Sequence, residues 1–189
     1  MERNDAIIRL GQEGNGDFFP GCAFNDPAGF AAAWNRVAAL LLAIPGNHFT
    51  VGLDFTKDRP VAKYTAGIEW SLVGFINLDV YDETYDAASQ STPEKRWSYL
   101  LHHGINETLA LAREKAKPVA FFEWATGRHG PIGGGDNPYF IARMAELIHD
   151  PANNVLGHAY WQSNSGYAGV IGPTANPNAW AEFKRQFGG

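Results

Sequence analysis

Two glutamates stand where apolar runs of the sequence give way to polar residues. Glu13 follows the apolar run at residues 6–10, and Glu123 follows the run at residues 118–122. In parallel α/β folds, the functional site lies at the carboxyl ends of the strands. A pair of carboxylic acids at such ends suits glycoside hydrolysis, in which one acid protonates the leaving oxygen and the other attacks the anomeric carbon. Either glutamate alone could equally be a buried acid with a structural partner, so the hypothesis rests on the pair.

Aromatic side chains near these strand ends would offer flat apolar surfaces to sugar rings. The candidates for such platforms are Trp124, Trp161, Phe18, Phe19 and Tyr160. Three further tryptophans lie inside predicted helices, where core packing is the better interpretation: Trp34, Trp97 and Trp180.

Apolar runs of strand length alternate with helical patterns along the whole chain. Strands are predicted at residues 6–10, 49–53, 73–81, 118–123 and 155–161. Helices are predicted at residues 27–44, 93–101, 105–117, 139–149 and 177–187. Strands that are apolar throughout and alternate with helices indicate a parallel sheet covered by helices. We therefore expect an α/β fold of about five β-α units, forming a single domain over residues 1–189.

Composition excludes several classes of protein. The chain has 189 residues, of which 45% are hydrophobic and only 19% charged, which excludes a disordered tail or a coiled coil. A net charge of −5 argues against a nucleic-acid partner. No apolar run is long enough to span a bilayer, so we expect no membrane partner. Residues 1–5 lack the shape of a signal peptide, and the cellular location stays undetermined.

Other chemical signals are weak, and we expect neither a cofactor nor a metal ion. The single cysteine, Cys22, allows no intrachain disulfide and no cysteine-based metal site. The six histidines show no metal-ligand spacing. The glycine run at residues 133–135 lacks the residues of a nucleotide-binding loop, and no Gly-x-Ser-x-Gly motif is present. Four acids are interpreted as loop charges, although the first ends a strand and could line a cleft: Asp54, Asp58, Glu69 and Glu83.

The segment Ile-Arg-Leu-Gly-Gln-Glu-Gly-Asn-Gly-Asp at residues 8–17 resembles the acid/base segment of glycoside hydrolase family 26, the β-mannanases. The likeness continues in the family's order at residues 78–82, which resemble the sixth barrel strand, and at residues 117–124, which resemble the nucleophile strand. It extends to residues 134–138 and 159–161. The resemblance implies that Glu13 is the general acid/base and Glu123 the nucleophile. It also implies a retaining mechanism, with the two carboxyl groups about 5–5.5 Å apart.

The resemblance also implies a set of substrate contacts. Tyr81 would hydrogen-bond the nucleophile, and Trp161 would stack on the sugar at the point of cleavage. The full set of expected substrate-binding residues is Gln12, Asn15, Tyr81, Trp124 and Trp161. The sequence departs from the family at Gln12, at Gly14 and at residues 19–21, where the family usually carries larger or aromatic side chains.

In the family that the sequence resembles, these motifs fall on strands four to eight of an eight-stranded barrel, so the resemblance implies a partial (β/α)8 TIM barrel. The expected function is that of a retaining, endo-acting glycoside hydrolase, or a truncated form of one, acting on a β-linked polysaccharide or oligosaccharide such as mannan. The alternatives are a carbohydrate-binding remnant without turnover and a structural half-barrel. Open sheet edges predict a homo-oligomer, a dimer or higher. The rival is a monomer in which residues 57–71 fold over the gap.

Overall fold

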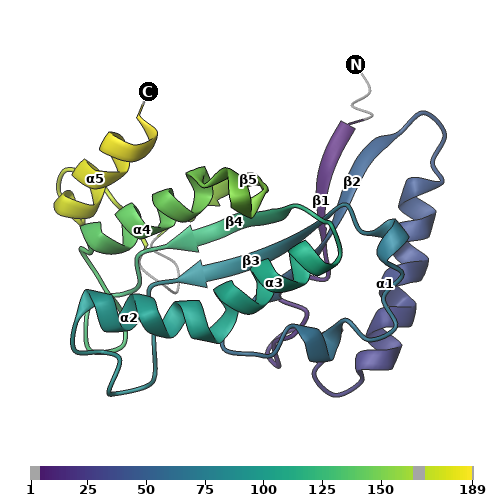
Figure 1. Ribbon diagram of the computed structural model, residues 1–189, viewed down its shortest axis with the longest axis horizontal. Coiled ribbons are helices and arrows are strands. Elements are labelled where there is room, and N and C mark those ends of the chain that lie inside the picture. The colour runs from purple at the N-terminus through teal and green to yellow at the C-terminus, as the bar shows by residue number, and fades with distance from the viewer. Residues whose placement is uncertain (1–4, 164–168, 189) are drawn as a thin grey trace. The chain divides into compact units, whose positions relative to one another are not determined.

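The protein forms one five-stranded sheet with helices along the chain between the strands (Figure 1). The computed structural model describes residues 5–163 and 169–188, so the predicted domain's ends at residues 1–4 and 189 lie outside it. The strands are β1 (Asp5–Leu10), β2 (His48–Thr56), β3 (Phe75–Tyr81), β4 (Val119–Ala125) and β5 (Val155–Tyr160), in the order β1-β2-β3-β4-β5. Neighbours in the sequence are neighbours in the sheet, and β1–β2 and β2–β3 pair in parallel. The predicted alternation of strands and helices is confirmed.

All five α-helices start within one residue of their predicted positions, and sequence signals fix the first turns of four of them. The helices are α1 (Pro27–Leu42), α2 (Pro93–Leu100), α3 (Asn106–Glu114), α4 (Pro138–His149) and α5 (Pro177–Phe187). Proline occupies the first turn of α1, α2, α4 and α5, where its missing N–H costs nothing. The side chains of Asp26, Thr92 and Asn137 cap α1, α2 and α4.

Four short helical turns lie between the main elements, and some predicted bounds differ from those in the structure. These turns are η1 (Ala62–Tyr64), η2 (Trp70–Leu72), η3 (Leu101–Ile105) and η4 (Pro151–Asn153). Residues 73–74 follow η2 and precede β3, although they were predicted as strand. The helix predicted at residues 105–117 ends at Glu114, and Ala116 has a left-handed φ of 51°. Among the described residues, none of the helices has the length and apolar character needed to cross a membrane.

Contacts along the chain group into two compact units. The first consists of Met1–Asp79 and His103–Ala120, and the second of Val80–His102 and Phe121–Gly189. The single-domain assignment for residues 1–189 stays a prediction, and each unit is described by itself.

The core of the first unit forms where α1 packs on β2. Phe30 and Trp34 of α1 are buried, and the Trp34 indole N–H donates a hydrogen bond of 3.0 Å to the Leu10 carbonyl at the end of β1. Gly52 pairs with Phe75 across the β2–β3 ladder, and a Cβ at Gly52 would lie 2.3 Å from the Phe75 ring. Only glycine permits this close approach, so the sequence fixes the packing of these two strands.

The core of the second unit is aromatic. The fully buried Trp124 of β4 lies at its centre, with ring centroids 6.1 Å from Phe140 of α4 and 5.8 Å from Phe187 of α5. Aromatic rings at these separations pack edge to face or tilted, which adds about 0.5–1.5 kcal/mol per pair to the burial of their area. This cluster holds α4 and α5 against β4.

Candidate active site

The side chain of Glu123 is held by a hydrogen bond from a tyrosine. The Tyr81 hydroxyl, at the end of β3, donates to Oε1 of Glu123 over 2.7 Å. Both residues are buried, with 6% of Tyr81 and 8% of Glu123 exposed. A hydrogen-bond donor on a buried carboxylate fixes the orientation of that carboxylate. The contact expected between Tyr81 and Glu123 is therefore present in the structure.

Trp124 faces away from Glu123, and the prediction that it contacts substrate is corrected here. Successive side chains of a strand point to opposite faces, so Glu123 and its neighbour Trp124 cannot share one face of β4. The Trp124 ring is fully buried among the aromatic residues of α4 and α5, and its indole N–H donates to Nδ1 of His158 over 3.3 Å. No part of this ring is accessible to a sugar, because the helices cover it.

Of the two aromatic residues at the end of β5, Tyr160 has structural contacts and Trp161 is exposed. The Tyr160 hydroxyl donates to the Gly169 carbonyl over 2.7 Å and accepts from the Thr126 amide, and burial raises the pKa of this phenol. Tyr160 is thus a structural residue. Trp161 directly follows β5, and 37% of it is exposed. Its amide donates to the Trp124 carbonyl over 2.9 Å, which fixes the backbone from which this exposed ring projects.

Glu13 lies in a tight turn after β1 with an unusual backbone conformation. Its φ is 44°, in the left-handed region that a residue with a side chain seldom adopts. Two backbone hydrogen bonds hold the turn: the Gly16 amide donates to the Glu13 carbonyl over 2.7 Å, and the Gly14 amide donates to the Asp54 carbonyl over 2.8 Å. The Glu13 side chain is half-buried. Residues kept in such strained conformations by their surroundings cluster at functional sites.

The neighbours of Glu13 divide into one buried and one exposed residue. The Asn15 amide is fully buried, accepts from the Thr56 amide over 2.8 Å and donates to the Thr56 carbonyl over 2.8 Å. It therefore fastens the Glu13 turn to the end of β2. Gln12 is exposed and available to a ligand. Direct substrate contact by Asn15 or Gln12 stays a prediction.

A buried charged network lies at the carboxyl half of the strands of the first unit, and the sequence analysis missed it. Arg9 of β1 binds both oxygens of Asp54 of β2, over 2.8 and 3.1 Å, and Oδ2 of Asp79 of β3 over 2.5 Å. The Asn77 amide bridges the same two carboxylates over 2.8 and 2.7 Å. Asp54, Asn77 and Asp79 are fully buried. The interpretation of Asp54 as a loop charge is therefore wrong. Asp54 links three strands of the sheet.

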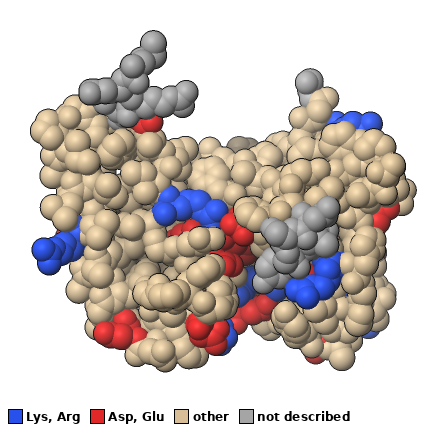
Figure 2. Space-filling model, turned by 180° about the vertical axis from the view of Figure 1, so that it is seen from behind, with Lys and Arg blue, Asp and Glu red and all other residues tan. Residues whose placement is uncertain are grey.

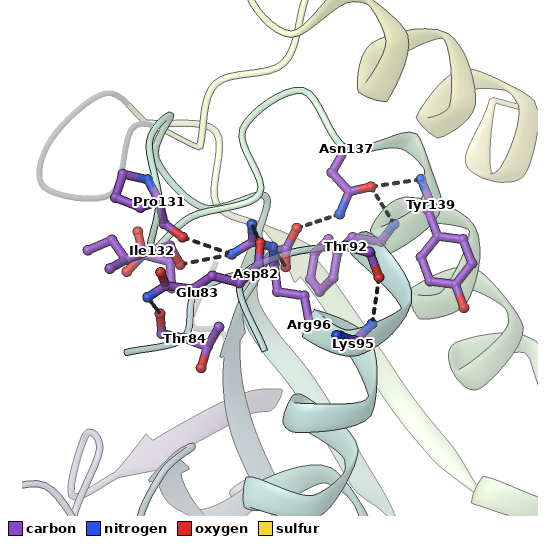
Figure 3. A network of polar contacts seen from close by, with 12 residues as sticks. Asp82, Glu83, Thr84, Thr92, Lys95, Arg96, Pro131, Ile132, Asn137 and Tyr139 are labelled. Atoms are coloured by element: carbon purple, nitrogen blue, oxygen red, sulfur yellow. Dashed lines mark hydrogen bonds and ion pairs between the residues drawn. The ribbon is translucent and has the colours of Figure 1, made fainter. Parts of the chain in front are cut away.

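A second network fixes the loops that follow β3 and β4 (Figure 3). Asp82, next to Tyr81, accepts from the Asn137 amide over 2.6 Å. Glu83 is 2% exposed and accepts from the backbone amide and the side-chain Nε of Arg128, over 3.1 and 2.9 Å. The interpretation of Glu83 as a solvated loop charge is therefore wrong. Both acids immediately follow Tyr81, so their contacts anchor the segment that carries the tyrosine.

Arg96 of α2 completes this second network. Its guanidinium donates to the backbone carbonyl of Gln90 over 2.9 Å. It also donates to the carbonyl of Ile132 over 3.3 Å (Figure 3). Its Nε lies 3.7 Å from Oδ1 of Asp82.

Within the described part of the chain, no group of three or more histidine, cysteine or acidic side chains is arranged to hold a metal ion.

Glu13 belongs to the first unit and Glu123 to the second, so the expected separation of about 5–5.5 Å between their carboxyl groups stays a prediction. The structure shows the local surroundings of each acid. One is a half-buried acid on a strained turn after β1. The other is a buried acid on β4, hydrogen-bonded to a tyrosine.

Comparison with known proteins adds evidence on the fold. No protein-family model matches the chain, and no curated protein matches it in sequence. Among solved structures, the chain is similar to a double mutant of the Cellulomonas fimi endo-β-1,4-mannanase, with 19% identity and a TM-score of 0.67, covering 96% of this chain and 41% of that one. The catalytic domain of the family 26 endo-β-1,4-mannanase of Bacillus sp. JAMB-750 matches with 20% identity and a TM-score of 0.61, covering 94% and 49%.

A fungal β-1,4-galactanase is also similar, with 15% identity and a TM-score of 0.61, covering 95% of this chain and 61% of that one. The chain spans about two fifths to three fifths of the length of these structures. At such identities the likeness concerns the fold. The chain therefore has the fold of part of a TIM-barrel glycosidase, as predicted, and family 26 mannanases are among the structures it matches.

Proposed function

We propose that this chain carries the catalytic residues of a retaining β-glycoside hydrolase, with Glu123 as the nucleophile and Glu13 as the general acid/base. The observation that carries the proposal is the hydrogen bond from Tyr81 to the buried Glu123 carboxylate. A nucleophilic carboxylate must be held in one orientation, and a hydrogen bond from a buried hydroxyl achieves this. The fold shared with mannanases and a galactanase supports the same assignment.

In the proposed reaction, Glu123 attacks the anomeric carbon of the sugar while Glu13 gives its proton to the glycosidic oxygen. The bond between that oxygen and the anomeric carbon breaks, and a glycosyl ester forms on Glu123. Glu13, now ionised, takes a proton from water, whose oxygen attacks the anomeric carbon and releases Glu123. Two inversions leave the sugar with its original anomeric configuration.

The proposed substrate is a polysaccharide or oligosaccharide of β-linked sugars, with β-1,4-mannan as the first candidate. The similar solved structures are named as mannanases and as a galactanase. Trp161 would stack on the sugar next to the bond that is cleaved, because a third of its surface is exposed at the end of β5. Sugar rings have apolar C–H faces that pack on such rings.

Turnover assays with variants test the proposal. The unmodified chain is incubated with β-1,4-mannan, β-1,4-galactan and mixed β-glucans, and reducing ends are measured beside Glu123→Gln and Glu13→Gln. Activity on one glycan that falls by several orders of magnitude in both variants supports the assignment. Glu114→Gln serves as the matched control, since Glu114 is an exposed helical acid paired with Lys115. Equal activity in the unmodified chain and in all three variants contradicts the assignment.

A non-catalytic carbohydrate-binding protein is the second candidate, because the exposed Trp161, Phe18 and Phe19 could bind sugars without turnover. Binding of a glycan that is unchanged in Glu123→Gln, without any reducing ends released, would favour this candidate.

We also propose that the chain associates with itself through β1. Ile7 on this edge strand is 53% exposed, and Leu40 of α1 is 63% exposed. An apolar edge strand in a parallel sheet favours pairing with another chain. Light scattering at micromolar concentration should give a dimer or a higher oligomer, and Ile7→Lys should shift it toward the monomer. A strictly monomeric unmodified chain would refute association.

A further inference from the structure

Two cations share one aromatic ring in the loop that follows β2. The guanidinium carbon of Arg59 lies 5.1 Å from the centre of the Phe24 ring, and Nζ of Lys63 lies 5.9 Å from the same centre. The Lys63 ammonium is also 5.0 Å from the centre of the Tyr64 ring. We call Arg59, Lys63 and Phe24 the basic cluster. The rings hold the two cations in place, since a cation over an aromatic face is favoured by about 0.5–1 kcal/mol even when exposed.

The basic cluster is attached to the turn that carries Glu13. The buried Asn15 amide binds the backbone of Thr56 and lies 3.4 Å from the Arg59 carbonyl. The Arg59 side chain donates to Oδ2 of Asp17 over 2.8 Å. Asn15 and Asp17 follow Glu13 closely in the sequence, so these contacts join the cluster to the turn of the proposed acid/base.

One cation of this loop, Lys63, has no ion-pair partner among the described residues, although the Glu107 carboxylate accepts from the neighbouring Ala62 amide over 3.0 Å. Lys57 pairs with Asp58 over 2.5 Å, and Arg59 pairs with Asp17. Lys63 is exposed, its polar contact is the Tyr64 hydroxyl at 3.5 Å, and within the described residues it makes no ion pair. On the face of the molecule drawn in Figure 2, some basic groups lie beside acidic ones and others stand apart from them. The Lys63 ammonium is therefore able to take an anionic partner from solution.

Two exposed aromatic residues follow Asp17, the ion-pair partner of Arg59. Phe18 and Phe19 follow Asp17, are 57% and 40% exposed, and pack edge to face with centroids 5.1 Å apart. A Cβ at Gly16 would lie 2.7 Å from the Phe18 ring, so the ring lies directly on this glycine. The loop thus combines a flat apolar surface with a cation, which matches a sugar ring that carries a negative group.

We infer that the basic cluster and the Phe18–Phe19 pair form a subsite for an acidic sugar, with Lys63 binding its anionic group. The inference rests on the proposed function, because it places the subsite beside Glu13 as the acid/base. The anionic group is either the carboxylate of a uronic acid or a sulfate ester. The net charge of −5 does not prevent this, because salt at physiological concentration screens charges beyond about 8 Å.

Binding measurements test the inference independently of turnover. Manno-oligosaccharides of one length are prepared in neutral, C6-carboxylated and 6-O-sulfated forms, and their affinities are measured by calorimetry on Glu123→Gln with and without Lys63→Gln. We expect at least one charged form to bind about two- to fivefold tighter than the neutral form at physiological ionic strength, the range of an exposed ion pair. Lys63→Gln should remove this preference.

Lys115→Gln is the matched control, since Lys115 also lies over an aromatic ring, 5.3 Å from the centre of Trp70, and belongs to the same unit. It should leave the preference intact. Tighter binding of the carboxylated form alone identifies a uronic acid, tighter binding of the sulfated form alone identifies a sulfate ester, and tighter binding of both identifies recognition by charge. Equal affinity for all three forms, no binding, or a preference that survives Lys63→Gln overturns the inference. A preference lost in Lys63→Gln, in a chain without turnover, leaves the subsite standing and rejects the proposed hydrolase.

Discussion

The Tyr81 hydroxyl donates a hydrogen bond of 2.7 Å to Oε1 of Glu123, and both side chains are more than nine-tenths buried. The tyrosine ends β3 and the glutamate belongs to β4, so the contact links neighbouring strands of the sheet. In a buried setting, a charge-assisted hydrogen bond is stronger than the same bond in water. This bond is the best-defined part of the proposed site.

Replacing Tyr81 by phenylalanine removes the donor and keeps the ring. A hydrogen bond to a charged group contributes about 1.5–3 kcal/mol, so kcat/KM should fall by roughly 10- to 100-fold if the bond acts in the transition state. Tyr160→Phe is the control, because the Tyr160 hydroxyl binds Thr126 and Gly169 instead. Steady-state rates of both variants are compared at temperatures where both are folded. This comparison separates the loss of the hydrogen bond to Glu123 from the loss of a structural tyrosine hydroxyl. Equal losses would show that Tyr81 has no special role.

Removing the Asn137 side chain should destabilise the protein more than the loss of an ordinary helix cap. Asn137 caps α4 through the amides of Tyr139 and Phe140, and it also donates to the buried carboxylate of Asp82. We expect Asn137→Ala to lower the free energy of unfolding by about 2–4 kcal/mol. Thr92→Ala removes only the cap of α2 and should cost about 1 kcal/mol. Urea unfolding measures both, and similar costs would contradict the second role of Asn137.

Arg9 should be far more important for stability than the exposed Arg59. Arg9 faces two fully buried carboxylates, Asp54 and Asp79. Replacing it by methionine removes the cation from this network, and breaking a buried ion pair costs about 3–5 kcal/mol. Arg59 pairs with Asp17 at the surface, where such a pair contributes about 0–1 kcal/mol. Urea midpoints that shift equally in Arg9→Met and Arg59→Met would contradict the structural role of the buried network.

The second unit should lose stability in mild acid through His158. Burial lowers the pKa of His158 from its usual value of 6.5, and the nearby His149 lowers it further. The unfolded chain then binds a proton more readily than the folded chain. The stabilisation is present above pH 6.5 and is lost as the pH falls toward the lower pKa of the folded state. Protonation also removes the lone pair on Nδ1 that accepts from Trp124.

Melting temperatures of His158→Gln between about pH 5 and pH 7.5 check this point, since an ordinary histidine changes its charge in about that range. The variant should show a smaller loss toward acid than the unmodified chain. His102→Gln, at an exposed position in η3, should not change the slope. A slope that is unchanged in His158→Gln would mean that other groups cause the acid sensitivity.

Local signals in the sequence predicted the order of the elements well. The pairs Asp26–Pro27, Thr92–Pro93 and Asn137–Pro138 each combine a capping side chain with a proline in the first turn. Such signals act within one turn and need no tertiary information.

The prediction that Trp124 contacts the substrate was wrong, although the information needed to avoid it was local. The same strand alternation that directs Glu123 to one face directs Trp124 to the other.

The charged networks could not be predicted in this way. Arg9 and Asp54 are 45 residues apart in the sequence, as are Glu83 and Arg128. The sequence around a charged residue at a strand end does not show whether that residue is solvated or paired. Its partner is set by the packing of the sheet. One signal was available: Asn77 and Asp79 alternate with apolar residues in the fully buried β3, which marks a polar stripe on one of its faces.

Covalent trapping tests the assignment of Glu123 most directly. The unmodified chain is incubated with a 2-deoxy-2-fluoro-β-mannosyl donor carrying a dinitrophenolate leaving group, and the protein is digested and analysed by mass spectrometry. Attack by the carboxylate forms a sugar ester and expels the phenolate with its electron pair, and the fluorine slows hydrolysis of that ester. We predict one labelled peptide, esterified at Glu123. The label should persist in Glu13→Gln, because this leaving group needs no proton, and disappear in Glu123→Gln. A label on another residue, or no label while the unmodified chain hydrolyses the same donor, would contradict the assignment.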